Sequence, residues 1–160
     1  RSTSSAASDV YKRQNKPLIL MGSEHKNLID YVHESAKEDY ENLASKYWPG
    51  ALTIVIPASA KQTAHLTSND QTIGLRIPNS NIAQSLLRET GPLLTSSANI
   101  SGFKGSITAE GIALDFPSVK ILGPIPWGKS SGKASTIIFW KKSGDWRLIR
   151  EGEVLVRELY

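Results

Sequence analysis

Short apolar runs rich in β-branched residues recur along the chain and predict β-strands. The clearest is 51–57, ALTIVIP, which reads as a central strand because almost every position is apolar. Residues 141–145 separate two such runs and are predicted to form a hairpin turn. The predicted strands are 17–21, 51–57, 72–77, 93–95, 119–122, 135–140, 146–149 and a last one from Gly152 to the end.

Amphipathic stretches lie between the first strands and predict helices. One runs from Ser23 to about residue 34, and a second is expected from Ser35 to about residue 47, since Ser35 and Glu38 have capping-box spacing. Further helices are predicted from Asn79 or Ser80 to about residue 89 and from Thr108 to 114. Interleaved helices and strands followed by a hairpin-rich last third predict a single α/β domain with a mixed parallel and antiparallel sheet.

Composition narrows the class of protein. The 160 residues are 39% hydrophobic and 21% charged, which is typical of a soluble globular domain. The absence of cysteine excludes disulfides, thiolate metal sites and a cysteine nucleophile, and the three histidines show no metal-binding spacing. The apolar runs are too short to span a bilayer and no secretory signal is evident, so the expected compartment is the cytoplasm. A net charge of +4 permits an anionic partner such as a nucleotide or RNA.

The first fourteen residues, RSTSSAASDVYKRQ, differ from the rest of the chain. They are rich in serine and show no apolar periodicity. Two interpretations are open: a disordered tail, or a non-native leader that resembles translated adapter sequence. We expect the native domain to begin near Asn15 and to cover 15–160.

The segment 95–102, TSSANISG, is the strongest candidate for chemistry. It directly follows a predicted strand, and its hydroxyls, amide and small side chains suit a phosphate or a carboxylate. The alternative is an ordinary Ser/Gly loop with local turn hydrogen bonds.

Two arginines stand at the ends of predicted strands. Arg76 lies in TIGLRIP and Arg150 in LIREGEV, and a guanidinium there could bind two oxygens of an anion. The alternatives are a solvated Arg76 and an ion pair of Arg150 with Glu151 or Glu153. The segment 128–132, GKSSG, lacks the spacing of a phosphate-binding P-loop.

The motifs NKPL, YWPGALT, LRIP, SSANISG, STII and LIREGEV follow one another in this order. The order resembles the YrdC/TsaC family, the threonylcarbamoyl-AMP synthases, over residues 15–154. The resemblance implies a twisted mixed sheet flanked by helices around a basic cavity. It also implies a nucleotidyltransferase that makes threonylcarbamoyl-AMP and pyrophosphate from L-threonine, bicarbonate and ATP. A partner complex would then transfer the threonylcarbamoyl group to tRNA.

The resemblance also implies roles for individual residues. Such a reaction needs positioning and charge neutralisation rather than a protein nucleophile, so no catalytic residue is assigned. Mg²⁺ is expected to arrive with ATP. The residues expected to bind the nucleotide are Lys16, Ser97, Asn99, Ser135 and Arg150. Those expected to line the cavity or contact substrate are Pro49, Thr53, Arg76, Ser96, Ala98 and Ser101.

One motif of the family is out of place. The family carries K-x-R-P just before N-x-P-L, whereas here Lys12 and Arg13 are adjacent and out of register. We therefore expect a homologue that lacks its N-terminal strand and helix and has impaired activity. Two other functions remain open: a non-catalytic module that binds tRNA or double-stranded RNA, and a carbamoyl-adenylate domain from a hydrogenase-maturation protein.

Overall fold

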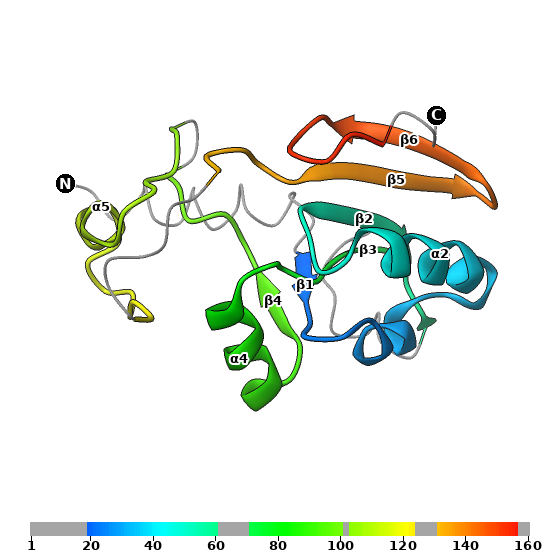
Figure 1. Cartoon of the computed structure of the whole chain (residues 1–160), viewed down its shortest axis with the longest axis horizontal. Coiled ribbons are helices and arrows are strands. Elements are labelled where there is room, and N and C mark those ends of the chain that lie inside the picture. Colours follow the sequence, from blue (N-terminus) through cyan, green and yellow to red (C-terminus); the bar gives the residue numbers. More distant parts are fainter. Residues whose placement is uncertain (1–18, 61–70, 101–102, 124–130, 157–160) are drawn as a thin grey trace. The chain divides into compact units, whose positions relative to one another are not determined.

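A six-stranded mixed sheet organises the larger part of the chain (Figure 1). The computed structural model describes residues 19–60, 71–100, 103–123 and 131–156. The chain divides into two compact units, Arg1–Thr95 with Ala134–Tyr160, and Ser96–Lys133. The strands are β1 (Ile19–Met21), β2 (Leu52–Pro57), β3 (Thr72–Arg76), β4 (Leu93–Thr95), β5 (Thr136–Lys142) and β6 (Asp145–Arg150). All six belong to the first unit.

The strand order is β4-β1-β3-β2-β5-β6. The pairs β1–β3 and β2–β5 are parallel, and the other three pairs are antiparallel. The predicted mixed α/β sheet is thus confirmed. Each of the six strands lies at or close to a range in which a strand was predicted.

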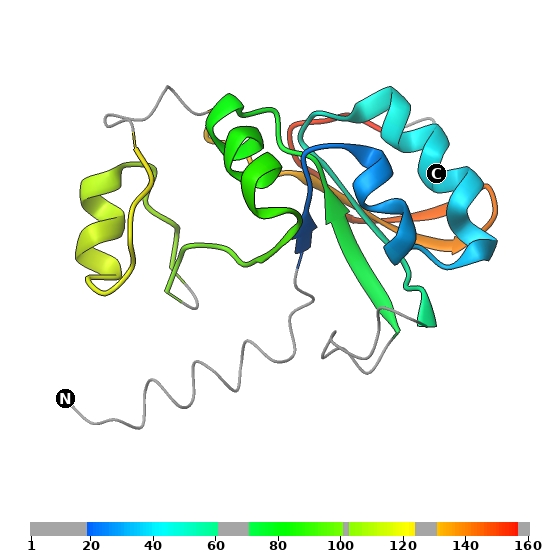
Figure 2. The ribbon, with the colours of Figure 1, turned by 90° about the horizontal axis from the view of Figure 1, so that it is seen from below.

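Cross-strand register gives the sheet two different faces. On the first, Ile54 pairs with Leu75 and with Ile138, and all three are fully buried. The helix α2 (Lys37–Tyr47) packs against this face, with Tyr40 and Leu43 in the same apolar cluster (Figures 1 and 2). We call this the packed face. Side chains alternate along a strand, so the neighbouring residues of each strand form the opposite face.

The helix predicted for 23–34 is wrong. The backbone instead forms three short 3₁₀ turns, because the chain leaves the helical path to pair with the segment after β2. The amide of His33 donates to the carbonyl oxygen of Pro57 at 2.9 Å, and the amide of Ser59 donates to that of Tyr31 at 2.8 Å. The turns are η1 (His25–Asn27), η2 (Ile29–Tyr31) and η3 (Glu34–Ala36). Long-range backbone pairing here overrides the local helical periodicity.

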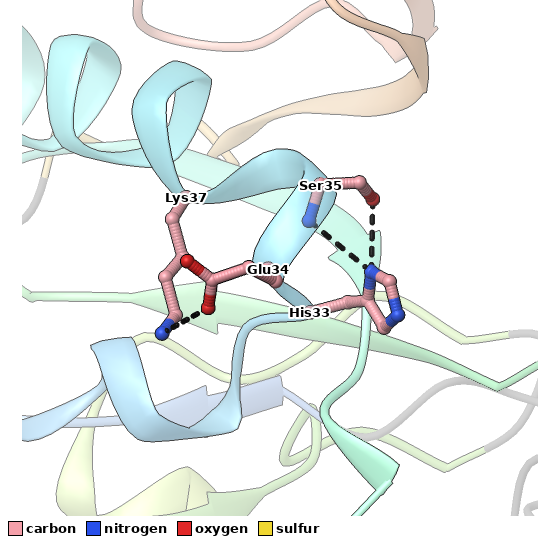
Figure 3. Close-up of polar contacts among 4 residues, drawn as sticks. All are labelled: His33, Glu34, Ser35 and Lys37. Atoms are coloured by element: carbon pink, nitrogen blue, oxygen red, sulfur yellow. Dashed lines mark hydrogen bonds and ion pairs between the residues drawn. The ribbon is translucent and has the colours of Figure 1, made fainter.

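The expected capping box at the start of α2 is also wrong. The hydroxyl of Ser35 lies 2.9 Å from Nδ1 of His33, and the same ring nitrogen accepts from the Ser35 amide at 3.2 Å (Figure 3). An ion pair of 2.6 Å between Lys37 and Glu34 flanks this contact. Ser35 therefore belongs to η3, where it contacts His33, and it does not cap α2 together with Glu38.

Two predicted helices are confirmed with their caps. In α4 (Asn81–Thr90), the hydroxyl of Ser80 accepts from the amide of Ala83 at 3.4 Å. In α5 (Ala109–Asp115), which belongs to the second unit, the hydroxyl of Thr108 accepts from the amide of Gly111 at 3.1 Å. None of the described helices is long and apolar enough to cross a membrane.

Two predicted strands are absent from the described residues. Val119 and Leu122 are exposed, and residues 119–122 form no strand. Residues 152–156 likewise form no strand, and the rest of the predicted last strand lies outside the described residues. Apolar composition alone was not enough to predict a strand in either segment.

The hairpin between β5 and β6 is confirmed and is fixed to α2. Gly144 turns the chain with φ of 70°, a conformation that favours glycine. One carboxylate oxygen of Asp39, in α2, accepts from Nε1 of Trp140 at 2.7 Å and from the Gly144 amide at 3.2 Å. The hairpin is thereby tied to the helix that covers the packed face.

Candidate functional site

One end of the sheet gathers polar side chains from four strands. The parallel strands β2 and β5 begin at this end, and the antiparallel strands β3 and β6 finish there. The register pairs Ile137 both with Thr53 and with Arg150, which places these residues on the opposite face of the sheet. Arg76 ends β3 on the same face, two residues beyond Gly74, which pairs with Val55. Topology thus collects residues that are far apart in the sequence.

A buried pair of hydroxyls lies at the centre of this group. Oγ1 of Thr53, which is 0% exposed, is 2.9 Å from Oγ of Ser135, which is 6% exposed. Arg150 closes over Ser135: its Nε donates to the Ser135 carbonyl oxygen at 3.0 Å, and its Nη2 donates to that oxygen at 2.8 Å and to Oγ at 3.1 Å. A guanidinium has five N–H donors, so Arg150 keeps donors for an anion while its orientation is fixed.

Arg76 supplies a second cation at this end of the sheet. Its Nε donates to the carbonyl oxygen of Gly50 at 3.1 Å, which connects β3 to the loop before β2. Burial lowers the pKa of Arg76; Glu153 acts in the opposite direction, and Arg150 lowers the pKa further. Arginine stays protonated in proteins, so the two guanidinium groups create a positive potential that Glu153 offsets only in part. The arrangement favours an anionic ligand.

Pro49 lies in the loop that Arg76 holds. Its side chain is exposed, and the Trp48–Pro49 peptide bond is cis. Trp48 donates from Nε1 to the carbonyl oxygen of Leu52 at 2.7 Å and packs edge-on against Tyr40, with ring centroids 5.7 Å apart. The loop is thus anchored to the packed face on one side and reaches the site on the other.

The candidate residues of the second unit form a local structure of their own. Nδ2 of Asn99 donates to the carbonyl oxygens of Ile100 and Phe103 at 3.1 and 3.0 Å, which closes the loop. Ser96, Ser97 and Ala98 are exposed in this loop. That these residues meet a ligand bound by the first unit stays a prediction. Lys16 and Ser101 lie outside the described residues.

Two residues of the site were not expected from the sequence. Thr136 is fully buried and hydrogen-bonds the segment that follows β6, and Gly152 in that segment touches the backbone before β5. A threonine at the start of the apolar run 137–140 and a glycine two residues after Arg150 were the available signals. Neither distinguishes such a contact from an ordinary strand end or turn.

The sequence matches one known protein family and several curated relatives. The Sua5/YciO/YrdC family model, described as "Telomere recombination", matches residues 5–152. Threonylcarbamoyl-AMP synthase of Bacillus subtilis (strain 168) is 30% identical over 140 residues, which cover 83% of this chain and 40% of the relative. The same-named protein of Yersinia pestis (strain Pestoides F) is 35% identical over 111 residues, which cover 67% and 58%. The chain therefore spans about half the length of these curated relatives.

Solved structures show the same architecture. The crystal structure of P. abyssi Sua5 complexed with L-threonine superposes with a TM-score of 0.77 at 28% identity, over 98% of this chain and 47% of that one. E. coli YciO shares the fold, with a TM-score of 0.75 at 24% identity over 92% and 71% of the two chains. The match to the family model covers most of the sequence, and the fold agrees with it. The chain belongs to the Sua5/YciO/YrdC family.

Proposed function

We propose that this chain carries the nucleotide-binding part of an L-threonylcarbamoyladenylate synthase. The observation that supports the proposal best is the group formed by Arg76, Arg150, Thr53 and Ser135 at one end of the sheet, where two guanidinium groups accompany a buried pair of hydroxyls. This donor set suits a polyphosphate. The curated relatives named threonylcarbamoyl-AMP synthase and the threonine complex of P. abyssi Sua5 agree with it.

The proposed reaction has two steps. The amine of L-threonine first adds to bicarbonate, with loss of water, to give a carbamate. A carbamate oxygen then attacks the α-phosphorus of ATP, the bond to the β-phosphate oxygen breaks, and threonylcarbamoyl-AMP and pyrophosphate form. Negative charge accumulates on the phosphate oxygens in the transition state, so the contribution of the protein is to orient and neutralise.

Each candidate residue has a proposed place in this reaction. Arg150 and Arg76 would face the phosphates, and Ser135 would bind near the adenylate. Thr53 and Pro49 would line the cavity beside them. The other residues proposed to contact the nucleotide or the substrate are Lys16, Ser96, Ser97, Ala98, Asn99 and Ser101.

The proposed metal is Mg²⁺, bound through the phosphates of ATP. Within residues 19–60, 71–100, 103–123 and 131–156, no three His, Asp or Glu side chains gather to hold an ion. Mg²⁺ commonly keeps several waters and binds through substrate phosphates, so we propose that it enters the site together with the nucleotide. The product would pass to a complex that transfers the threonylcarbamoyl group to tRNA.

The test is ATP–pyrophosphate exchange that depends on both L-threonine and bicarbonate. We would assay the 160-residue chain and, in parallel, the full open reading frame that encodes it. The expected result is exchange by the full product that disappears when either threonine or bicarbonate is omitted. Exchange that needs carbamoyl phosphate instead would indicate the hydrogenase-maturation activity. Absence of exchange, with RNA binding that weakens steeply as salt rises, would replace the proposal by a non-catalytic RNA-binding module.

A further inference from the structure

A buried threonine joins the segment after β6 to the beginning of β5. Oγ1 of Thr136 accepts from the amides of Gly152 and Val154 at 3.0 and 3.2 Å and donates to the Val154 carbonyl oxygen at 2.6 Å. The Glu153 amide donates to the carbonyl oxygen of Ala134 at 3.0 Å. One hydroxyl with 0% exposure thus satisfies three backbone groups of a segment that forms no strand.

Gly152 allows this segment to come close. A Cβ atom at Gly152 would lie 2.4 Å from both the Ala134 carbonyl oxygen and the Thr136 amide nitrogen, and 2.5 Å from the Ser135 carbonyl carbon. These atoms are backbone, which cannot swing aside as a flexible side chain can. Any larger residue would therefore push the segment away from the start of β5.

The same short stretch carries Arg150 and Ser135. Arg150 stands two residues before Gly152, and Ser135 stands directly before Thr136. The guanidinium donates three hydrogen bonds to Ser135, so the two backbones must stay close for the contact to persist. Arg150 is the last residue of the edge strand β6, where it pairs with Ile137, and residues 152–154 are the next attachment of this strand end to the start of β5.

We propose that Thr136 is a positioning residue for Arg150. Its hydroxyl holds residues 152–154 against residues 134–136 and so presents the guanidinium of Arg150, already oriented by Ser135, to the phosphate that the site binds. We call this arrangement the Thr136 clamp. That the bound phosphate belongs to a nucleotide rests on the proposed function. That Thr136 holds Arg150 in place does not. Fixing a donor before the ligand arrives removes part of the entropy cost of binding.

The test compares Thr136→Val with Thr136→Ser in the 160-residue chain. Valine keeps the shape and removes the hydroxyl, whereas serine keeps the hydroxyl. The first measurement is solvent exchange of the Arg150 Nε–H proton by NMR, assigned with Arg150→Ala, since this proton is bonded to the Ser135 carbonyl oxygen. We expect exchange to be at least about tenfold faster in Thr136→Val and close to wild type in Thr136→Ser.

The second measurement is the affinity for MgATP. We expect Thr136→Val to bind about tenfold more weakly and Thr136→Ser to stay within about twofold. In the Arg150→Ala background, Thr136→Val should cause little further loss, because the clamp acts through Arg150. A residue that merely stabilised the fold would weaken binding equally in both backgrounds.

The outcomes separate the clamp from the proposed function. A folded Thr136→Val protein that keeps both slow Arg150 exchange and wild-type MgATP affinity would overturn the clamp. Loss of slow exchange in Thr136→Val, with no MgATP binding by the wild-type chain, would support the hold on Arg150 and contradict the nucleotide site. If Thr136→Val fails to fold, Gly152→Ala makes the same test, since it displaces the segment and leaves Thr136 intact.

Discussion

The two faces of the sheet are built from adjacent residues but differ in what surrounds them. On the packed face, Ile54, Leu75 and Ile138 are all 0% exposed and belong to one apolar cluster with residues of α2. On the opposite face, Thr53 and Ser135 are buried by pairing with each other and with a guanidinium. Burial of the first set is stabilised by apolar packing, and burial of the second set by hydrogen bonds that include a charged donor.

The difference shows how the candidate site depends on the core. A shift of one residue in the pairing of β2 would move Thr53 to the packed face and Ile54 to the opposite one. Burial of the apolar residues penalises that shift strongly, so the packed face sets the register of both faces. The residues of the site are then aligned by contacts in which they take no part.

The largest effect should come from truncating the packed face. Ile138→Ala removes a fully buried side chain from the middle of β5, and we expect a loss of about 2–5 kcal/mol in the free energy of unfolding. The matched control is Ile137→Ala, one residue away on the opposite face and only half-buried, which should cost clearly less. Urea denaturation with comparison of m-values measures both. Equal losses would mean that the two faces are packed alike.

The opposite face should respond more in binding than in stability. Arg150→Ala removes a charge-assisted donor, and we expect MgATP to bind about 10- to 100-fold more weakly. The unfolding free energy should fall by only about 1 kcal/mol, because the lost hydrogen bonds to Ser135 are part-buried while the arginine side chain itself lies at the surface. Isothermal titration and urea denaturation of the same protein give the two numbers.

Arg147→Ala is the matched control for Arg150→Ala. Arg147 lies on the same strand and face, and its guanidinium carbon is 5.1 Å from the centre of the Phe139 ring rather than on the site hydroxyls. MgATP affinity should therefore be unchanged in Arg147→Ala. Equal weakening by the two variants would indicate a general effect of positive charge on the anion and would argue against a specific place for Arg150.

A smaller change is expected where the packed face meets the hairpin. Asp39→Ala leaves Trp140 Nε1 and the Gly144 amide without their acceptor, so we expect a loss of about 1–2 kcal/mol in unfolding free energy. Glu34→Ala, which breaks an exposed ion pair with Lys37, should change nothing measurable. Thermal or urea unfolding compares them. A neutral Asp39→Ala would show that packing alone holds the hairpin to α2.

Sequence patterns predicted the packed face better than the opposite one. Alternation and β-branched runs located the strands, because each strand that buries one face carries its own apolar pattern in the sequence. The helix expected at 23–34 failed because the partners of Tyr31 and His33 lie at the end of β2 and just after it, where no local pattern can show them. Local periodicity is therefore a reliable guide only where an element does not pair with a distant one.

The candidate site divides in a similar way. Arg76 and Arg150 were found because motif and strand end coincide, and the structure brings both to the end of the sheet with Thr53 and Ser135. The Thr53–Ser135 contact joins residues 82 positions apart, so only the parallel pairing of β2 and β5 reveals it. Thr136 was missed because a hydroxyl that binds backbone leaves no pattern in the sequence.

The smallest effect should appear as a pH dependence of the packed face. Tyr40 is fully buried and donates to the His25 carbonyl oxygen at 2.7 Å, and burial raises the pKa of its phenol above the ordinary value near 10. The folded state therefore holds the phenol proton more tightly than the unfolded state. This contribution to stability is complete below pH 10 and declines above it, as the unfolded chain ionises.

Between pH 10 and pH 10.5, the wild type should lose about 0.4 kcal/mol more unfolding free energy than Tyr40→Phe, which cannot ionise. The variant itself should be about 1 kcal/mol less stable at neutral pH, since it lacks the hydrogen bond to His25. Urea titrations of both proteins at matched pH values measure the difference, and the other ionising groups cancel in the comparison. If the unfolding free energies of the two proteins changed in parallel with pH, Tyr40 would be reached by water through local opening of the packed face. A packed face that opens in this way could not hold the strand register on which the opposite face depends.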